Sequence, residues 1–192
     1  MTRRLTMIGL CAALLFAACS SSSNNGASSS EGKKYVNAML AAKGKNDLTK
    51  DLTNDQAKCL ADGLVNIVGV DTLKKAKVSP ADFAGSGADS KLKGKISKDQ
   101  AGQVADLILK NKCFDFVDEI SKQNTDSTFA KLSKTKQRCF YEKMFALPAV
   151  RTALIADLTG GNSNIGNALG GQSQLFTILG QCGINPNDVS GR

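Results

Sequence analysis

The side chains that could do chemistry in this chain are carboxylates, lysines and cysteines, because the sequence contains no histidine. Without histidine, the commonest general base and metal ligand is missing, and Ser–His or Cys–His nucleophilic pairs within the chain are excluded. The acids best placed for hydrolase chemistry lie on segments with a helical pattern: Asp62, Asp106, Asp115, Asp118, Glu119 and Glu142. Three of these, at 62, 106 and 142, occupy equivalent helix positions, which favours a solvated feature of a repeat. We therefore expect no catalytic residues, no cofactor and no enzymatic activity.

The first twenty residues have the pattern of an export signal. Arg3 and Arg4 precede an apolar stretch that ends at Ala18 and is followed by Cys19. Such a stretch is too short for a membrane-spanning helix, which takes about 20 apolar residues. A cysteine directly after two alanines resembles the lipobox of bacterial lipoproteins, although Phe16 stands where a smaller aliphatic residue is usual. We expect a lipoprotein signal peptide over residues 1–18 and acylation of Cys19. Ordinary cleavage with release, or an uncleaved anchor, is the alternative.

A polar, basic segment follows the proposed anchor. Residues 19–34 are rich in serine and asparagine and predict a lipidated flexible tether, with a helical domain over residues 35–192. Lysines gather near the anchor, and the chain has a net charge of +8. A basic segment beside a membrane is attracted to anionic lipid, although a merely solvated surface explains the lysines as well. Export, and the lack of arginine clusters interleaved with aromatic residues, argue against a nucleic-acid partner.

From Tyr35 onward the apolar period is helical, and three segments begin alike. Thr53, Ser97 and Ser133 each follow an aliphatic residue and precede a helical pattern, so each is a candidate N-cap. Each segment runs into a break and a second helix, expected over 71–77, 114–122 and 149–158. We expect an all-α fold: a compact bundle of about three helical hairpins plus a first and a last helix, the last over 174–181. A Gly/Ser/Lys-rich loop is expected over 79–95 and a flexible connector over 160–173.

Four cysteines lie beyond the signal and anchor. An even number in an exported domain predicts disulfides, and their spacing suits neither a zinc site nor a Cys-x-x-Cys redox site. Three pairings exist for four cysteines. The hairpin alignment selects Cys59–Cys113 and Cys139–Cys182, because Cys59 and Cys139 occupy the same position in their hairpins. Each bond would then clamp an early helix to the next cysteine along the chain.

The segments 52–61 and 65–73 resemble a group of small exported or lipid-anchored helical proteins from actinobacteria. The resemblance rests on Cys59-Leu60-Ala61 and on Gly69-Val70-Asp71 at set spacing, and it covers roughly residues 35–185. It implies a fold and a location. It supplies no activity and no catalytic residues.

Together these observations favour a lipid-anchored, non-catalytic binding or scaffold module at the extracytoplasmic face of the cell membrane. Its partners would be the membrane, through the acyl anchor, and an unidentified protein or cell-envelope component. A carrier of lipid or another apolar molecule is the alternative, with a cell-wall hydrolase third. The following apolar side chains are expected to form the core, although they could line a groove: Leu64, Ile67, Val68, Leu107, Ile108, Phe140, Met144, Phe145, Val150 and Leu154.

Overall fold

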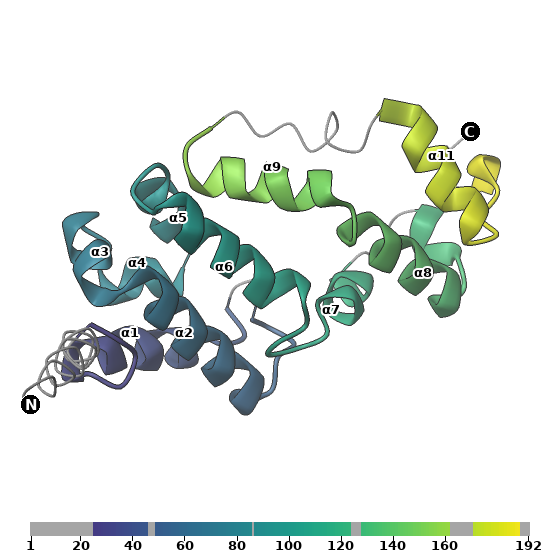
Figure 1. The fold of residues 1–192 in the computed structure, drawn as a ribbon. Helices are drawn as coiled ribbons and strands as arrows, with labels where there is room; N and C mark the ends of the chain where they lie inside the picture. Colours follow the sequence, from purple (N-terminus) through teal and green to yellow (C-terminus); the bar gives the residue numbers. More distant parts are fainter. Residues whose placement is uncertain (1–24, 46–48, 86, 124–127, 162–170, 189–192) are drawn as a thin grey trace, which may run out of the picture.

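The computed structural model describes residues 25–45, 49–85, 87–123, 128–161 and 171–188 (Figure 1). Every regular element within these ranges is a helix, which confirms the all-α prediction. None of these helices is both long and apolar enough to cross a membrane. The expected signal peptide and Cys19 lie outside the described residues.

The helices follow one another with short connections. Their bounds are α1 Ser30–Ala41, α2 Asn54–Val68, α3 Val70–Lys75, α4 Pro80–Ala84, α5 Gly87–Leu92, α6 Lys98–Leu109, α7 Phe116–Gln123, α8 Lys134–Phe145, α9 Pro148–Leu158 and α11 Gly171–Gln181. Two 3-10 turns, η1 Thr128–Lys131 and η2 Pro186–Asp188, complete the described elements.

The three predicted N-caps begin the three long helices that follow them. The side chains of Thr53, Ser97 and Ser133 accept hydrogen bonds from the third helical amides of α2, α6 and α8. In α2 and α6 the glutamine at that third position, Gln56 or Gln100, accepts a hydrogen bond from the cap's own amide and completes a capping box. These helix starts are therefore determined locally, by the cap and the residue three positions later.

Gln100 also joins two helices. Its Nε2 donates to the carbonyl oxygens of Ile67, at 3.0 Å, and Val68, at 2.9 Å. These carbonyls belong to the last turn of α2, where the helix itself offers no partner. One side chain thus serves the start of α6 and the end of α2. Gly69, at φ +80°, then allows the chain to turn directly into α3.

Residues that the tether prediction leaves outside the domain, within 25–34, belong to the described fold. α1 starts at Ser30, capped by the Ser29 side chain, and Ala27 is buried. The amide of Ala27 donates to Asn66 Oδ1 at 2.8 Å. Low hydrophobicity suggested a flexible segment up to residue 34, but Ser29 caps α1 and Asn25 accepts hydrogen bonds from backbone amides of α3.

The segment 79–95 also differs from the expected loop. It contains α4 and α5. Ser79 caps α4 in a capping box with Asp82, and Phe83 of α4 is buried against Tyr35 of α1 in an edge-to-face ring contact. One apolar ring and one cap suffice for a helix too short to show a period in the sequence.

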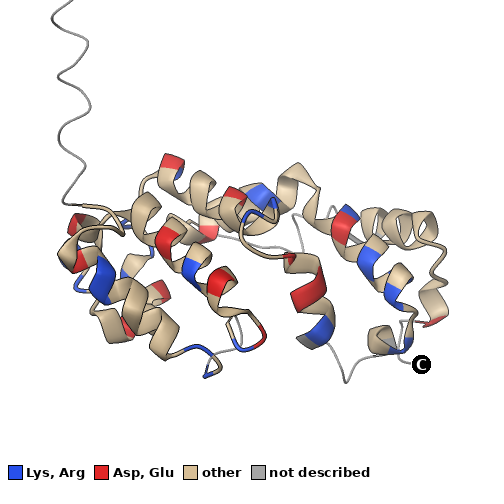
Figure 2. Ribbon diagram, turned by 90° about the horizontal axis from the view of Figure 1, so that it is seen from below, with Lys and Arg blue, Asp and Glu red and all other residues tan. Residues whose placement is uncertain are grey.

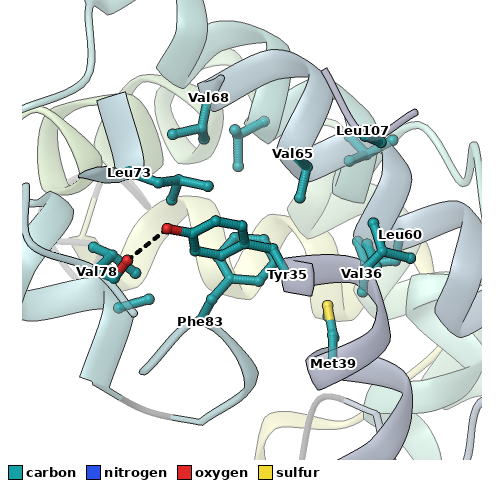
Figure 3. Close-up of a cluster of buried hydrophobic side chains, with 14 of the residues drawn as sticks. Tyr35, Val36, Met39, Leu60, Val65, Val68, Leu73, Val78, Phe83 and Leu107 are labelled. Atoms are coloured by element: carbon teal, nitrogen blue, oxygen red, sulfur yellow. Dashed lines mark hydrogen bonds between the residues drawn. The ribbon is translucent and has the colours of Figure 1, made fainter. Parts of the chain in front are cut away.

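Buried apolar side chains form two clusters. The N-terminal cluster is formed mainly by the helices from α1 through α6. It includes Tyr35, Leu60, Val65, Leu73 and Phe83 (Figure 3). The hydroxyl of Tyr35 donates a buried hydrogen bond to the carbonyl oxygen of Val78, at 2.9 Å. This bond ties α1 to the segment after α3 and satisfies the one polar atom that the ring carries into the cluster.

The C-terminal cluster is smaller and lies at the other end of an elongated molecule (Figure 1). Val117, Phe140, Tyr141, Ile178, Leu179 and Ile184 form its buried part. Gln137 is buried beside it and donates from Nε2 to the carbonyls of Ala130 and Leu132, which fixes η1 on α8. α7 and α11 pack on α8 to close this cluster.

Helix α9 connects the two clusters. It begins at Pro148, with two residues between it and the end of α8, but it packs mainly along α6, and its Ile155 belongs to the N-terminal cluster. Of the predicted core residues, those buried are Val68, Leu107, Phe140 and Val150. The partly buried ones, which pack on one or other cluster, are Leu64, Ile67, Ile108, Met144, Phe145 and Leu154.

Candidate functional site

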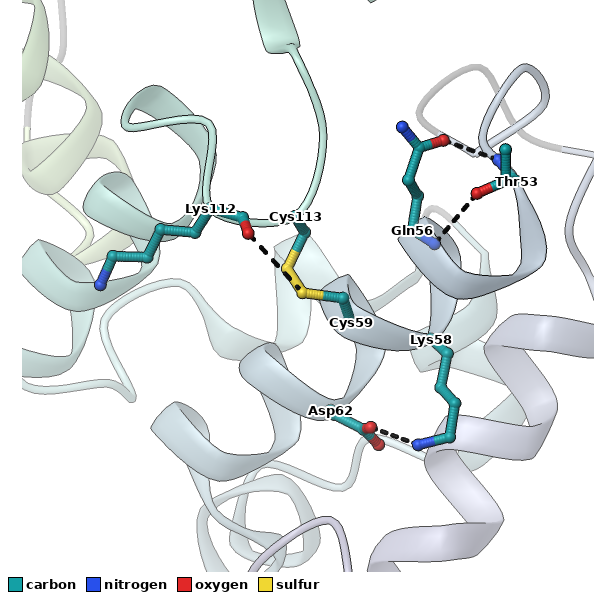
Figure 4. Close-up of a disulfide and its surroundings, with 7 residues drawn as sticks. All are labelled: Thr53, Gln56, Lys58, Cys59, Asp62, Lys112 and Cys113. Carbon is teal, nitrogen blue, oxygen red and sulfur yellow. Dashed lines mark hydrogen bonds and ion pairs between the residues drawn. A yellow bond between two sulfur atoms is a disulfide. The ribbon is translucent and has the colours of Figure 1, made fainter.

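Asp62, the first of the candidate acids, is engaged by a lysine on its own helix. It forms an ion pair with Lys58, one turn earlier on α2, at the solvent-facing side of that helix (Figure 4). Figure 2 shows that acidic and basic residues are interspersed along the helices. Such an exposed i,i+4 pair stabilises a helix by a few tenths of a kcal/mol and provides no unusual chemistry.

Asp106 lies at the contact between α6 and α9. Its Oδ1 accepts from Arg151 Nε at 2.8 Å, and its Oδ2 accepts from Lys110 Nζ at 3.0 Å. Arg151 also donates from Nη2 to the carbonyl of Gly102 at 3.3 Å. The hydrogen bond from Arg151, with help from Lys110, lowers the pKa of Asp106 to about 2 although partial burial opposes the shift. A carboxylate held this way remains ionised and is a poor proton donor.

Asp115 and Glu142 share one guanidinium. Arg138 donates from Nη2 to Asp115 at 2.6 Å and from Nε to Glu142 at 2.7 Å. Burial acts to raise the pKa of Asp115, but the hydrogen bond and charge of Arg138 outweigh it and the pKa is lowered. These two acids do come together at Arg138, yet the arrangement favours an ionised Asp115. General acid catalysis needs the opposite, a carboxyl with a raised pKa.

Asp118 and Glu119 meet on α7 at one lysine. Lys122 Nζ lies 2.8 Å from Asp118 Oδ2 and 2.8 Å from Glu119 Oε1. Hydrogen bonds to Asp118 and then Glu119 raise the pKa of Lys122, so the lysine remains charged. Glu119 is 6 % exposed, and its Oε2 has no hydrogen-bond partner. Because burying an unpaired polar atom costs folding free energy, Glu119 is the most destabilising of the six candidate acids.

The six acids therefore fall into separate ion-paired groups on α2, on α6 with α9, and around α7 and α8. No group of three or more cysteine and acidic side chains is arranged to hold a metal ion within the described parts of the chain. Asp62, Asp106 and Glu142 occupy equivalent positions as predicted, and each is matched by a cation one turn away.

Sequence reasoning overlooked Arg138 and Arg151, which organise these groups. A signal was present: between the signal segment and the last residue, these are the only arginines, and all other basic residues are lysines. Arginine presents a rigid fork of donors that can engage two acceptors, so an isolated arginine in a lysine-rich chain indicates a structural ion pair.

The predicted disulfides are both formed. Cys59 and Cys113 have Cα atoms 5.5 Å apart, and Cys139 and Cys182 have Cα atoms 5.7 Å apart. The first links α2 to the connection between α6 and α7 (Figure 4). The second links α8 to the end of α11. Both cross-links join elements that already pack together, so they restrict the unfolded chain without imposing a new geometry.

Comparisons with known proteins give no relative for this chain. No family model, no curated protein and no solved structure matches it. The resemblance to exported actinobacterial proteins stays a prediction.

Proposed function

We propose that this protein is a lipid-anchored, non-catalytic binding or scaffold module that works at the extracytoplasmic face of the cell membrane. The observation that carries the non-catalytic part is the ion pairing of the candidate acids. Asp106 and Asp115 have lowered pKa values, and Arg138 and Arg151 hold their carboxylates at the contacts between helices. Side chains used in this way position helices.

The two disulfides support the extracytoplasmic location. Bonds across 54 and 43 residues persist in an oxidising compartment and are rare in the cytosol. The anchor itself rests on the sequence, through the signal-like residues 1–18 and Cys19.

The exposed surface supports a protein or polymer partner over an apolar ligand. Among the described residues, Phe176 is the one large apolar side chain that is exposed to solvent, at 48 %. Most of the other large apolar residues of the described chain pack in one of the two clusters or against it. We therefore expect the partner to meet a mainly polar, lysine-rich surface.

Mass spectrometry of the protein isolated from the membrane fraction tests the anchor. We expect the amino-terminal peptide to begin at Cys19 and to carry the mass of the acyl groups. A Cys19→Ala variant should appear as precursor or in the medium. An unmodified Cys19 in mature, membrane-associated protein would contradict the anchor.

Two kinds of variant test the non-catalytic role. Asp62→Asn with Glu142→Gln removes two candidate acids that each pair with a cation of their own helix, so a cellular phenotype that depends on the protein should persist. Cys19→Ala should abolish that phenotype, because the module would no longer be held at the membrane. Loss of function in the first, still folded variant would favour a hydrolase.

A further inference from the structure

The end of the domain that receives the chain from Cys19 is basic. We define the basic end as five exposed lysines: Lys33, Lys34, Lys74, Lys75 and Lys77. The first two lie in the first turns of α1, and the other three lie at or just after the end of α3. Glu31 and Asp71 are the acids on these same segments, so the lysines outnumber them.

Direct contacts hold these two segments together. Lys74 Nζ lies 3.4 Å from Glu31 Oε2, which places the end of α3 beside the first turn of α1. Asn25, the first described residue, accepts from the amide of Val70 at 2.9 Å through its carbonyl and from the amide of Asp71 at 2.7 Å through its side chain. The described chain therefore begins on α3, and Figure 1 shows α3 and the start of α1 at one extremity of the elongated molecule.

The distance along the chain from Cys19 to this end is short. Asn25 follows Cys19 by six residues, and a fully extended chain spans at most about 3.6 Å per residue. An acylated Cys19 would therefore keep Asn25 within roughly 20 Å of the bilayer surface. The lysines of α8 lie on a helix of the C-terminal cluster, at the far extremity of the molecule (Figure 1).

We propose that the basic end binds the anionic phospholipid headgroups of the membrane that holds the acyl anchor. This inference rests on the proposed anchor at Cys19. It gives the domain an orientation: α1 and α3 face the bilayer, and α8 and α11 project away from it. Each lysine held at an anionic surface adds roughly fivefold to the binding constant, and the attraction decays over about 8 Å at physiological salt. Lysines of equal charge on α8 are therefore out of range.

Amine labelling of the reconstituted protein tests this orientation. The acylated protein, purified from membranes, is placed in vesicles of phosphatidylcholine alone or with phosphatidylglycerol, and a membrane-impermeant amine reagent is applied briefly. We expect labelling of Lys33, Lys75 and Lys77 to fall at least threefold in the anionic vesicles, as measured by peptide mass spectrometry. Labelling of Lys134 and Lys143 on α8 should not change. High salt should remove the difference.

Matched charge-reversal variants test which lysines are responsible. Lys75→Glu with Lys77→Glu should abolish the protection of Lys33, whereas Lys134→Glu with Lys143→Glu should leave it intact. All four positions are exposed, so both variants should keep the circular dichroism of the parent.

Equal labelling of Lys33 in both kinds of vesicle would overturn the proposal. The proposal would also be overturned if the α8 lysines were protected as strongly as Lys33 in the anionic vesicles. Full protection of Lys33 in the Lys75→Glu, Lys77→Glu variant would overturn it as well. The mass of the amino-terminal peptide from the same sample distinguishes a failure of the proposed orientation from a failure of the proposed anchor. Acylated Cys19 without protection rejects the orientation alone, whereas an unmodified Cys19 rejects the anchor and the orientation together.

Discussion

The side chain of Gln100 offers a quantitative test of how the N-terminal cluster is assembled. Its Oε1 accepts from the Ser97 amide at 2.9 Å, and its Nε2 donates to two carbonyls at the end of α2. Gln56 is a matched control. It occupies the same capping-box position in α2 and is half-buried like Gln100, but within the described chain its hydrogen bonds are confined to its own cap.

The free energies of unfolding of Gln56→Ala and Gln100→Ala should differ by the contribution of the hydrogen bonds between α6 and α2. A net hydrogen bond contributes about 1 kcal/mol, so Gln56→Ala should lower the free energy of unfolding by about 1 kcal/mol. Gln100→Ala also leaves the carbonyls of Ile67 and Val68 without their donor, and we expect a loss of about 2–3 kcal/mol. For a domain of this size the difference of about 1–2 kcal/mol corresponds to roughly 2–8 °C in Tm.

The two tyrosines provide the assay. The sequence has no tryptophan, Tyr35 lies in the N-terminal cluster, and Tyr141 lies in the C-terminal cluster. In a Tyr141→Phe background, tyrosine fluorescence during urea unfolding reports on the N-terminal cluster alone. Far-UV circular dichroism of the same samples follows the whole molecule.

A third variant isolates the amide. Gln100→Glu keeps an acceptor for the Ser97 amide but replaces the donor with a negative charge beside two carbonyls. It should destabilise the domain at pH 7 at least as much as Gln100→Ala. Equal losses for Gln56→Ala and Gln100→Ala, or a Gln100→Glu variant as stable as the parent, would refute the view that this amide joins α2 to α6.

Three further outcomes are expected. Arg151→Gln should raise the pKa of Asp106 from about 2 toward its ordinary 3.8, measured by NMR titration. Because the folded pKa is the lower one, this ion pair contributes stability above about pH 4 that is lost as the pH falls toward 2, and urea midpoints of the variant should vary less over that window. Cys139→Ala with Cys182→Ala should lower the stability reported by Tyr141 by up to about 4 kcal/mol, and a larger change at Tyr35 would contradict the two-cluster description. Glu119→Gln should be neutral or stabilising in urea unfolding, because it removes a buried charge with an unpartnered oxygen, whereas a loss above about 2 kcal/mol would show that the pair with Lys122 is essential.

The long helices and the disulfide pairing were predictable because their causes are local. Thr53, Ser97 and Ser133 mark helix starts through the amides a few residues away, and the matching offsets of Cys59 and Cys139 follow from that alignment. Such signals need no knowledge of which helices meet in space.

Features that depend on contacts distant in sequence were missed. Asn25 and Ala27 belong to the folded domain because of partners more than 35 residues away, and composition alone described them as tether. Helix α4 is stabilised by the contact between Phe83 and Tyr35, which no local pattern shows. The two-cluster arrangement, and the part that Arg151 plays between α6 and α9, likewise arise from packing between elements.

The positions of the disulfides make the chain two covalent rings joined by a single strand of backbone. Both cysteines of the first bond precede both cysteines of the second, so neither of these two cross-links spans the segment between Cys113 and Cys139. One peptide-bond cleavage there would yield two separately closed fragments. They would remain associated through α9 on α6, including the pair between Arg151 and Asp106. The molecule is thus a natural candidate for reconstitution from two halves, with the strength of the α6–α9 contact read directly as a dissociation constant.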